Sequence, residues 1–255
     1  MKKMISIINS SERSVNKGKL EKDENGYRKV LLGALNVFNS KGELYSAEQE
    51  VLDLFRADST LMRRMKKKYL KGEAGHPKRE PGMSANEFVN RNLAIYETHV
   101  SHHIKDVMLV EKEQPGQGGK KIVEVWGWVK PSGIFGDALE KAFENPDENV
   151  AFSIRCFSKK RLINGIWVRR IVQIITWDWV NEPGIGIANK FDSISNEDHG
   201  VDVEYVFDLE DLAHGNEIDE CLNCTLESDE QREILEDTIK NYNNTSNEYD
   251  IINGW

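Results

Sequence analysis

Two residues, a histidine in a loop and a serine on a strand, are of the types that perform nucleophilic catalysis together. His76 lies between Gly75 and Pro77 in a segment rich in glycine and proline, residues 71–82, where nothing apolar would bury it. Because imidazole titrates near neutral pH, a histidine held between such neighbours can act as a general base. An exposed histidine without a function is the alternative, and this feature alone does not decide between the two.

Ser153 lies in a segment, residues 150–158, whose pattern predicts a β-strand. Alternate side chains of a strand point to opposite faces, so Ser153 and Arg155 are expected on one surface. A serine becomes nucleophilic beside a base, and nearby donors must stabilise the oxyanion that forms. A solvated strand face is the commoner reason for a Ser-x-Arg pattern. The core face of the strand is expected to hold Phe152, Ile154 and Cys156.

Asp178 is a carboxylate among bulky apolar residues, in the sequence Ile-Ile-Thr-Trp-Asp-Trp-Val. A charge in such a setting must be paired or hydrogen-bonded, or it will bind a proton. Orienting an imidazole would satisfy it. A purely structural ion pair with Arg169 or Arg170 is an equal alternative.

The elements expected to position these residues are mostly strands, and the intervening segment 71–82 is expected to be a loop. Strands with only a few helices predict an α+β domain built around a closed or nearly closed sheet. Residues 201–212 fit a strand or a helix, and disorder is expected from residue 241. Strands are expected at 30–38, 95–110, 122–130, 150–158 and 166–180, and helices at 47–70, 86–92, 135–144 and 227–241.

Charge is distributed unevenly along the 255 residues, whose net charge is −9. Residues 191–255 carry 19 Asp or Glu and two Lys or Arg, a net charge of −17, against +8 for residues 1–190. The sequence therefore predicts a flexible leader (1–26), a catalytic domain (27–190) and an acidic C-terminal extension (191–255). A basic body with an acidic extension favours docking of the two parts, or docking to charged partners.

Composition argues against several other classes of protein. No apolar run is long enough to span a bilayer, and the first residues do not form a signal peptide. Three cysteines are too few for a disulfide framework, which fits a reducing compartment. Cys221 and Cys224 form a single CxxC without a second pair of ligands, so two ordinary thiols are a better interpretation than structural zinc. Neither a metal nor an organic cofactor is expected.

A cluster of basic residues on the helix expected at 47–70 allows a nucleic-acid-binding module as a competing interpretation. Such a module would bind DNA in a salt-sensitive way, but the acidic extension would compete for the same surface. A solvated basic face is the commoner explanation, so nucleic acid is not an expected partner. The cluster consists of Arg63, Arg64, Lys66, Lys67 and Lys68.

Five short motifs, in their order along the chain, resemble the prohead proteases of large tailed phages. The resemblance covers about residues 27–190, and no single motif is specific for the family. The motifs are the Gly-x-x-Gly-His-Pro-like loop of 72–77, Val-Ser-His-x-Ile at 100–104, Trp-Gly-Trp-Val-x-Pro-Ser-Gly at 126–133, Val-Ala-Phe-Ser-Ile-Arg at 150–155 and Trp-Asp-Trp-Val-Asn-Glu-Pro at 177–183.

The resemblance implies a fold similar to the herpesvirus assembly proteases, an antiparallel β-barrel surrounded by helices with a Ser-His pair on its surface. His76 then matches the base, Ser153 the nucleophile and Asp178 the third member, which is a second histidine in the herpesvirus enzymes. Arg155 matches the oxyanion site, through its backbone N–H or its side chain. A homo-oligomer is compatible with the resemblance, because the herpesvirus enzymes need dimerisation.

The resemblance also implies a serine endopeptidase that acts in the host cytoplasm, inside the assembling procapsid, on capsid and scaffold proteins. The related cleavage signal resembles Ser-x-Glu, which this chain contains five times, whereas composition alone would supply about two. Self-cleavage that removes the acidic extension is therefore expected. A non-enzymatic procapsid core protein that keeps the fold is the remaining alternative. The candidate cleavage sites follow Glu48, Glu197, Glu230 and Glu248.

Overall fold

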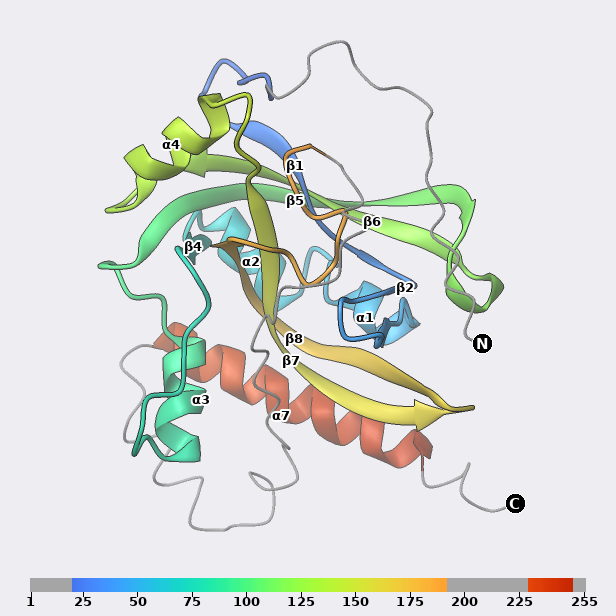
Figure 1. Cartoon of the computed structure of the whole chain (residues 1–255). Coiled ribbons are helices and arrows are strands. Elements are labelled where there is room, and N and C mark those ends of the chain that lie inside the picture. The colour runs from blue at the N-terminus through green and yellow to red at the C-terminus, as the bar shows by residue number, and fades with distance from the viewer. Residues whose placement is uncertain (1–19, 192–228, 250–255) are drawn as a thin grey trace.

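Two four-stranded sheets form the centre of the molecule (Figure 1), and the computed structural model describes residues 20–191 and 229–249. Among the strands of the described residues, every pair is antiparallel except β3 with β8, which is parallel. The first sheet has the order β1 (Arg28–Leu35), β6 (Lys121–Pro131), β5 (Val100–Pro115) and β4 (Lys71–Glu73). The second has the order β2 (Val37–Phe38), β3 (Leu44–Tyr45), β8 (Ile166–Val180) and β7 (Ala151–Ile163).

Helices surround the two sheets, with α3 and α7 on the same side of the β7–β8 hairpin (Figure 1). A 3₁₀ turn, η1, joins β5 to β6 at Gln117–Gly119. The mixed α and β content confirms that part of the expected fold class. The helices are α1 (Gln49–Asp53), α2 (Thr60–Lys66), α3 (Ala85–Leu93), α4 (Gly136–Glu144) and α7 (Asp229–Tyr249).

The expected closed or nearly closed barrel is wrong for the described residues. Closure requires an unbroken ladder of hydrogen bonds around the sheet. Between β4 and β8 the pairing consists of an isolated bridge from Ala74 to Trp179, next to which the Gly75 N–H donates to the Trp179 carbonyl at 2.7 Å. The two sheets therefore meet at one corner and remain separate ladders.

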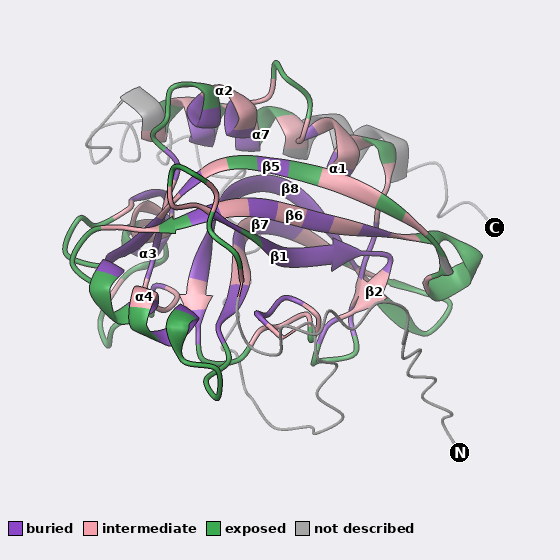
Figure 2. Ribbon diagram, turned by 90° about the horizontal axis from the view of Figure 1, so that it is seen from above, coloured by how far each residue is buried: buried purple, intermediate pink, exposed green. Residues whose placement is uncertain are grey.

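The strand β6 confirms the expected alternation of side chains. Its odd-numbered positions from 123 to 129 are buried, while the even-numbered positions between them are half-buried. Burial is concentrated on the central strands (Figure 2). Gly127 is required at one of these buried positions, because a Cβ there would lie 2.3 Å from the Leu32 side chain on the adjacent strand.

The single helix expected at 47–70 is two helices, which corrects that prediction. The first helix, α1, ends at Leu54. A new helix begins after Ser59, whose hydroxyl accepts a hydrogen bond from the Met62 N–H at 3.2 Å. Serine at this position satisfies a free N–H at the start of a helix, so the cap defines a second start. The apolar periodicity continues across the break and does not reveal it.

The segment 71–82, expected to be a loop, begins with the edge strand β4. Gly72 allows this strand to approach its neighbours closely. A Cβ at this position would lie 2.1 Å from the Trp177 carbonyl oxygen and 2.3 Å from the His102 ring. The glycine that argued against a strand is therefore what allows the strand to pack here.

Helix α7 extends eight residues beyond residue 241, where disorder was expected. Its Ile234 and Leu235 side chains are buried in a second apolar cluster that α3, β7 and β8 also form. The described part of the expected leader, residues 20–26, contacts the body through Leu20, which packs on the main core. Residues 201–212, Cys221 and Cys224 lie outside the described residues.

Candidate active site

The β7–β8 hairpin and the end of β4 bring the three expected catalytic residues together. Ser153 on β7 lies directly opposite Asp178 on β8 in the antiparallel register. His76 follows β4, whose bridge to β8 at Ala74 carries the loop across to the same corner. The corner at which the two sheets meet is therefore what assembles the site.

Asp178 binds His76 directly. The His76 Nδ1 and the Asp178 Oδ2 are 2.8 Å apart, and the carboxylate is completely buried. Because a carboxylate accepts hydrogen bonds, Nδ1 carries the proton in this pair. In the neutral imidazole, Nε2 is then unprotonated and able to accept a proton. This is the arrangement that a general base requires.

A buried guanidinium keeps Asp178 ionised. Arg155 donates from Nε to one carboxylate oxygen of Asp178 and from a terminal nitrogen to the other, both at 2.8 Å, while the Glu73 N–H donates at 2.9 Å. Burial alone would raise the pKa of Asp178, but the charge of Arg155 and the hydrogen bonds from His76 and Arg155 hold this pKa well below its usual range. Asp178 is thus an anion beside the imidazole at neutral pH.

Arg155 does not lie on an exposed surface with Ser153, as the alternation predicted. Its side chain is 3% exposed, and besides Asp178 it binds Glu73 at 3.0 Å and the Ala94 carbonyl at 3.0 Å. Burial would lower the pKa of this guanidinium, but Asp178 and Glu73 raise it. On the expected core face of β7, Phe152 is buried but Ile154 and Cys156 are only half-buried. Alternation also does not indicate that Glu73 and the end of α3 cover the face that carries Arg155.

Glu73 is a further member of the network, and the sequence interpretation missed it. Its buried carboxylate is bound by Arg91 at 2.6 and 3.1 Å and accepts the Tyr96 N–H at 2.6 Å. It also contacts Arg155, so two carboxylates and two guanidinium groups form a continuous chain from Asp178 to α3. The signal in the sequence was a single glutamate three positions before His76.

The alternative partners of Asp178, Arg169 and Arg170, are bound elsewhere. Arg169 binds Glu43 at 2.5 and 2.9 Å, and Arg170 contacts Glu50 at 2.6 Å. A purely structural pair between either arginine and Asp178 is therefore wrong.

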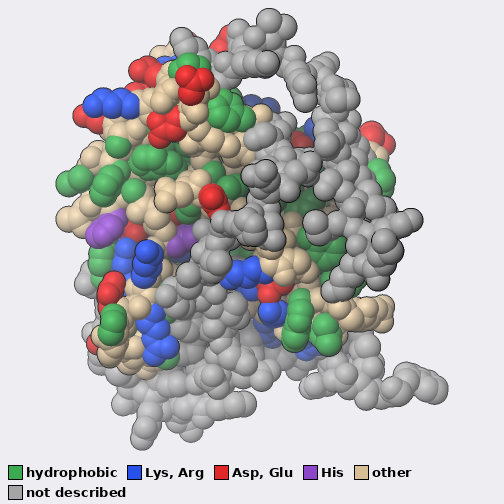
Figure 3. All heavy atoms as spheres, viewed as in Figure 1, with side chains coloured by type: hydrophobic (Ala, Val, Ile, Leu, Met, Phe, Trp, Pro, Cys, Tyr) green, Lys and Arg blue, Asp and Glu red, His purple; other side chains and the backbone are tan. Residues whose placement is uncertain are grey.

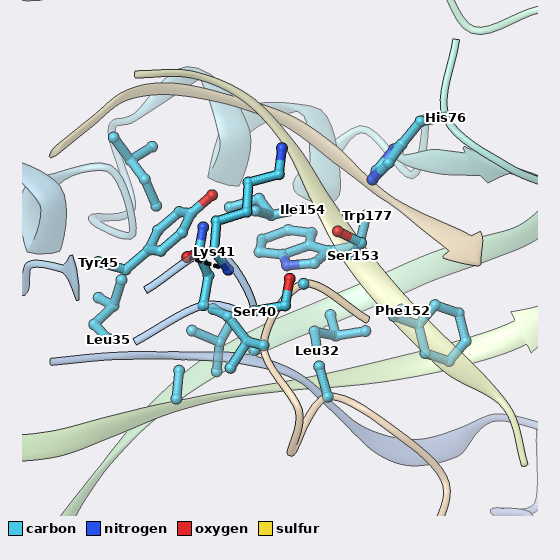
Figure 4. Close-up of a pocket in the computed structure, with 18 of the residues that line it drawn as sticks. Leu32, Leu35, Ser40, Lys41, Tyr45, His76, Phe152, Ser153, Ile154 and Trp177 are labelled. Atoms are coloured by element: carbon cyan, nitrogen blue, oxygen red, sulfur yellow. Dashed lines mark hydrogen bonds between the residues drawn. The ribbon is translucent and has the colours of Figure 1, made fainter. Parts of the chain in front are cut away.

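Ser153 and His76 line one pocket, of about 670 Å³ when the open mouth is included. Figure 4 shows the His76 imidazole pointing toward the Ser153 hydroxyl, with Trp177 and Phe152 close to the serine. Among the described residues no hydrogen bond to this hydroxyl is present, so it is available to a bound substrate. Hydrogen bonds between a nucleophile and its base are often long before substrate binds.

His102 is a second histidine near the site, but it is part of the core. Its ring is fully buried, 2.8 Å from the Ser101 hydroxyl and edge-on to Phe152 with ring centroids 5.1 Å apart. Burial lowers its pKa to about 4, against a smaller opposing effect from the Asp178 charge. His102 therefore stays neutral across the physiological range.

The burial of His102 predicts a loss of stability in mild acid. The unfolded chain takes up a proton near pH 6.5, whereas folded His102 does so only near 4, so the free energy of unfolding falls as pH drops between these values. The loss should reach about 3 kcal/mol, and it should be absent above pH 6.5. Urea unfolding of wild type, His102→Gln and the exposed control His99→Gln at pH 7 and pH 4.5 measures it. A pH dependence in His102→Gln equal to that of wild type would contradict the prediction.

The expected basic face on α2 is partly occupied. Arg63 binds Glu233 and lies 3.6 Å from Asp237, both on α7, and the Arg64 guanidinium is buried against the Ile175 carbonyl at 2.5 Å. Of the five basic residues, Arg63 is therefore bound by the acidic helix α7 and Arg64 is buried against β8. Lys66, Lys67 and Lys68 remain exposed.

Residues able to bind a metal ion do not gather in the described chain. Over residues 20–191 and 229–249, no three His, Cys, Asp or Glu side chains are grouped as a set of ligands would be. Within the same ranges, no helix is long and apolar enough to cross a membrane.

On the face in Figure 3, Lys and Arg side chains lie just below the His side chains.

The candidate cleavage sites lie in different settings. Glu48 is half-buried at the start of α1. Glu230 and Glu248 lie in helix α7 and not in an extended tail. Glu197 lies outside the described residues. Helical backbone must unwind before a protease can bind it, so of the two sites on α7 neither is presented in an extended form.

Comparison with known proteins identifies the family of this chain. The family model described as the peptidase S80 family matches residues 7–253. The chain belongs to the peptidase S80 family. It is 37% identical over 187 residues to the "Capsid maturation protease" of Pseudomonas phage phiKZ, which covers 72% of this chain and 67% of that protein. The resemblance to phage prohead proteases is therefore confirmed. No solved structure matches the chain.

Proposed function

We propose that this member of the S80 family is a serine endopeptidase of phage procapsid maturation. In this proposal Ser153 is the nucleophile, His76 the general base and Asp178 the orienting third member. The observation that supports it best is the 2.8 Å contact between His76 and the buried carboxylate of Asp178, in a pocket that Ser153 also lines. The related phage protein is named for capsid maturation, which supports this setting.

In the proposed reaction His76 removes the proton of the Ser153 hydroxyl as its oxygen attacks the scissile carbonyl. The protonated imidazole then lies beside the Asp178 anion and passes the proton to the leaving amine. A water molecule then attacks the acyl-enzyme while His76 removes its proton. His76 returns this proton to the Ser153 oxygen as the bond to the acyl group breaks. Arg155 fixes the orientation of Asp178 through its side chain, so its proposed part in the oxyanion site is left to its backbone N–H.

We further propose that the enzyme cleaves capsid and scaffold proteins, and itself, after Glu in Ser-x-Glu-like sites. It would act in the host cytoplasm within the assembling procapsid. The proposal includes a homo-oligomer, and it includes neither nucleic acid nor a membrane as a partner. Among the self-cleavage candidates Glu48, Glu197, Glu230 and Glu248, cleavage after Glu197 would break the peptide chain between the body and α7.

Intact-mass analysis of the purified protein tests the proposal. We expect wild type to accumulate a shorter form whose new C-terminus is Glu, and Ser153→Ala to keep its full mass. Incubation of trace wild type with an excess of full-length Ser153→Ala should cleave the variant, which establishes cleavage between molecules. Equal masses for both proteins, together with no cleavage of a Ser-Asn-Glu peptide, would instead favour the non-enzymatic core protein.

A further inference from the structure

The pocket beside Ser153 has apolar walls and carries no negative charge among its described lining residues. Two lining side chains can carry a positive charge, His76 and Lys41. Figure 4 shows Ser153 between His76 on one side and the turn that carries Ser40 and Lys41 on the other. The apolar walls include Leu32, Leu35, Phe55, Ile154, Ile171 and Trp177.

The turn that presents Lys41 is held in one conformation. The Asn39 side-chain oxygen accepts the N–H groups of Lys41 at 3.1 Å and Glu43 at 2.8 Å. The Ser40 N–H donates to the carbonyl of Gly184, a further lining residue of the pocket, at 2.8 Å. Gly42 has a φ of +74°, which glycine adopts without strain. Lys41 is therefore presented from a preorganised support.

The charge of Lys41 is not neutralised by its neighbours. Lys41 forms no ion pair within the described residues, although Glu43 lies two positions away. Glu43 is buried and bound by Arg169 and Lys160, so its charge is already balanced. Lys41 is itself exposed, which leaves its ammonium group free to reach a ligand in the pocket.

We infer that Lys41 is the residue that selects an acidic side chain in the substrate. A glutamate fits this pocket because its methylene groups can lie against the apolar walls while its carboxylate binds the ammonium group. A neutral glutamine loses the charge-assisted bond, and a lysine is repelled. The inference rests on the proposed function and adds to it the residue that determines specificity.

The test compares three peptides that differ only at the residue before the cleaved bond, which is Glu, Gln or Lys. For wild type we expect Glu to be preferred over Gln in kcat/KM, and for Lys41→Gln we expect this preference to fall about 10- to 100-fold. Lys41→Glu should prefer the Lys peptide over the Glu peptide. Lys120→Gln, an exposed lysine in the β5–β6 hairpin, is the matched control and should keep the wild-type preference.

Two results separate failure of this inference from failure of the proposed function. Cleavage of the Glu peptide by wild type with an unchanged Glu-to-Gln ratio in Lys41→Gln and Lys41→Glu would overturn the role of Lys41 and leave the protease intact. No cleavage of any peptide by wild type would overturn the proposed function itself. Because Lys41 is exposed in a turn, both variants should fold, and circular dichroism verifies this.

Discussion

Alanine at Ser153, at His76 or at both positions is expected to lower kcat/KM by the same factor, about 10⁴ or more. The reason is that the serine hydroxyl is a weak nucleophile without a base, and the imidazole has no proton to remove without the serine. Residues that act as one unit give effects that do not multiply. Initial rates on one Glu-containing peptide, measured for the two single variants and the double variant, provide the comparison.

The matched control for this set is His99→Ala, because His99 is exposed and lies away from the pocket lining. It should retain wild-type activity. Losses that multiply in the double variant would show that Ser153 and His76 act independently. Retention of activity in Ser153→Ala would assign the nucleophile to another residue.

Replacement of Arg155 by methionine is expected to destabilise the fold by about 3–5 kcal/mol. The change keeps a long side chain but leaves the buried carboxylates of Asp178 and Glu73 without the guanidinium that lies between them. We also expect activity to fall, since the carboxylate that orients His76 loses two hydrogen bonds. Urea unfolding at pH 7 measures the stability, and kcat/KM at a temperature where the variant is folded measures the second effect.

The pH dependence of Arg155→Met distinguishes electrostatic loss from a simple packing defect. In wild type the lowered pKa of Asp178 supplies stability above the unfolded value of about 3.9, which is lost as pH falls toward the folded value. Without Arg155, burial raises the pKa of Asp178, so the difference from wild type should be largest at pH 7 and smaller near pH 4. Arg56→Met, an exposed arginine with ion pairs longer than 3.5 Å, should change stability by no more than about 1 kcal/mol. An Arg155→Met effect as small as this would contradict the prediction.

Local pattern predicted most of the elements that carry the site, but not the edge strand β4. The strands at 122–130, 150–158 and 166–180 were predicted, and in β6 the burial alternates as the sequence pattern does, whereas β8 is buried on both faces. The helix at 86–92 was predicted to within one residue at each end, and the structure shows a capping box of Ser84 and Glu87 at its start. These features depend on neighbours in the sequence.

Features that depend on distant contacts were predicted poorly. The barrel remained open because the pairing of β4 with β8 is reduced to one bridge, which no local pattern encodes. The burial of Arg155 depends on Glu73 and on the Ala94 carbonyl, which lie 82 and 61 positions earlier. The pairing of Asp178 with His76 spans 102 positions and was available only through the resemblance to a known family.

The docking of α7 has a consequence for the products of the proposed self-cleavage. The helix is held by buried Ile234 and Leu235, by a hydrogen bond from Asn241 to the Val172 carbonyl at 3.2 Å and by acidic contacts to Arg63. None of these contacts requires an intact peptide chain between the body and the helix. A single cut after Glu197 would therefore produce a nicked, two-chain enzyme whose small fragment remains bound, and high salt or dilution would be needed to dissociate it.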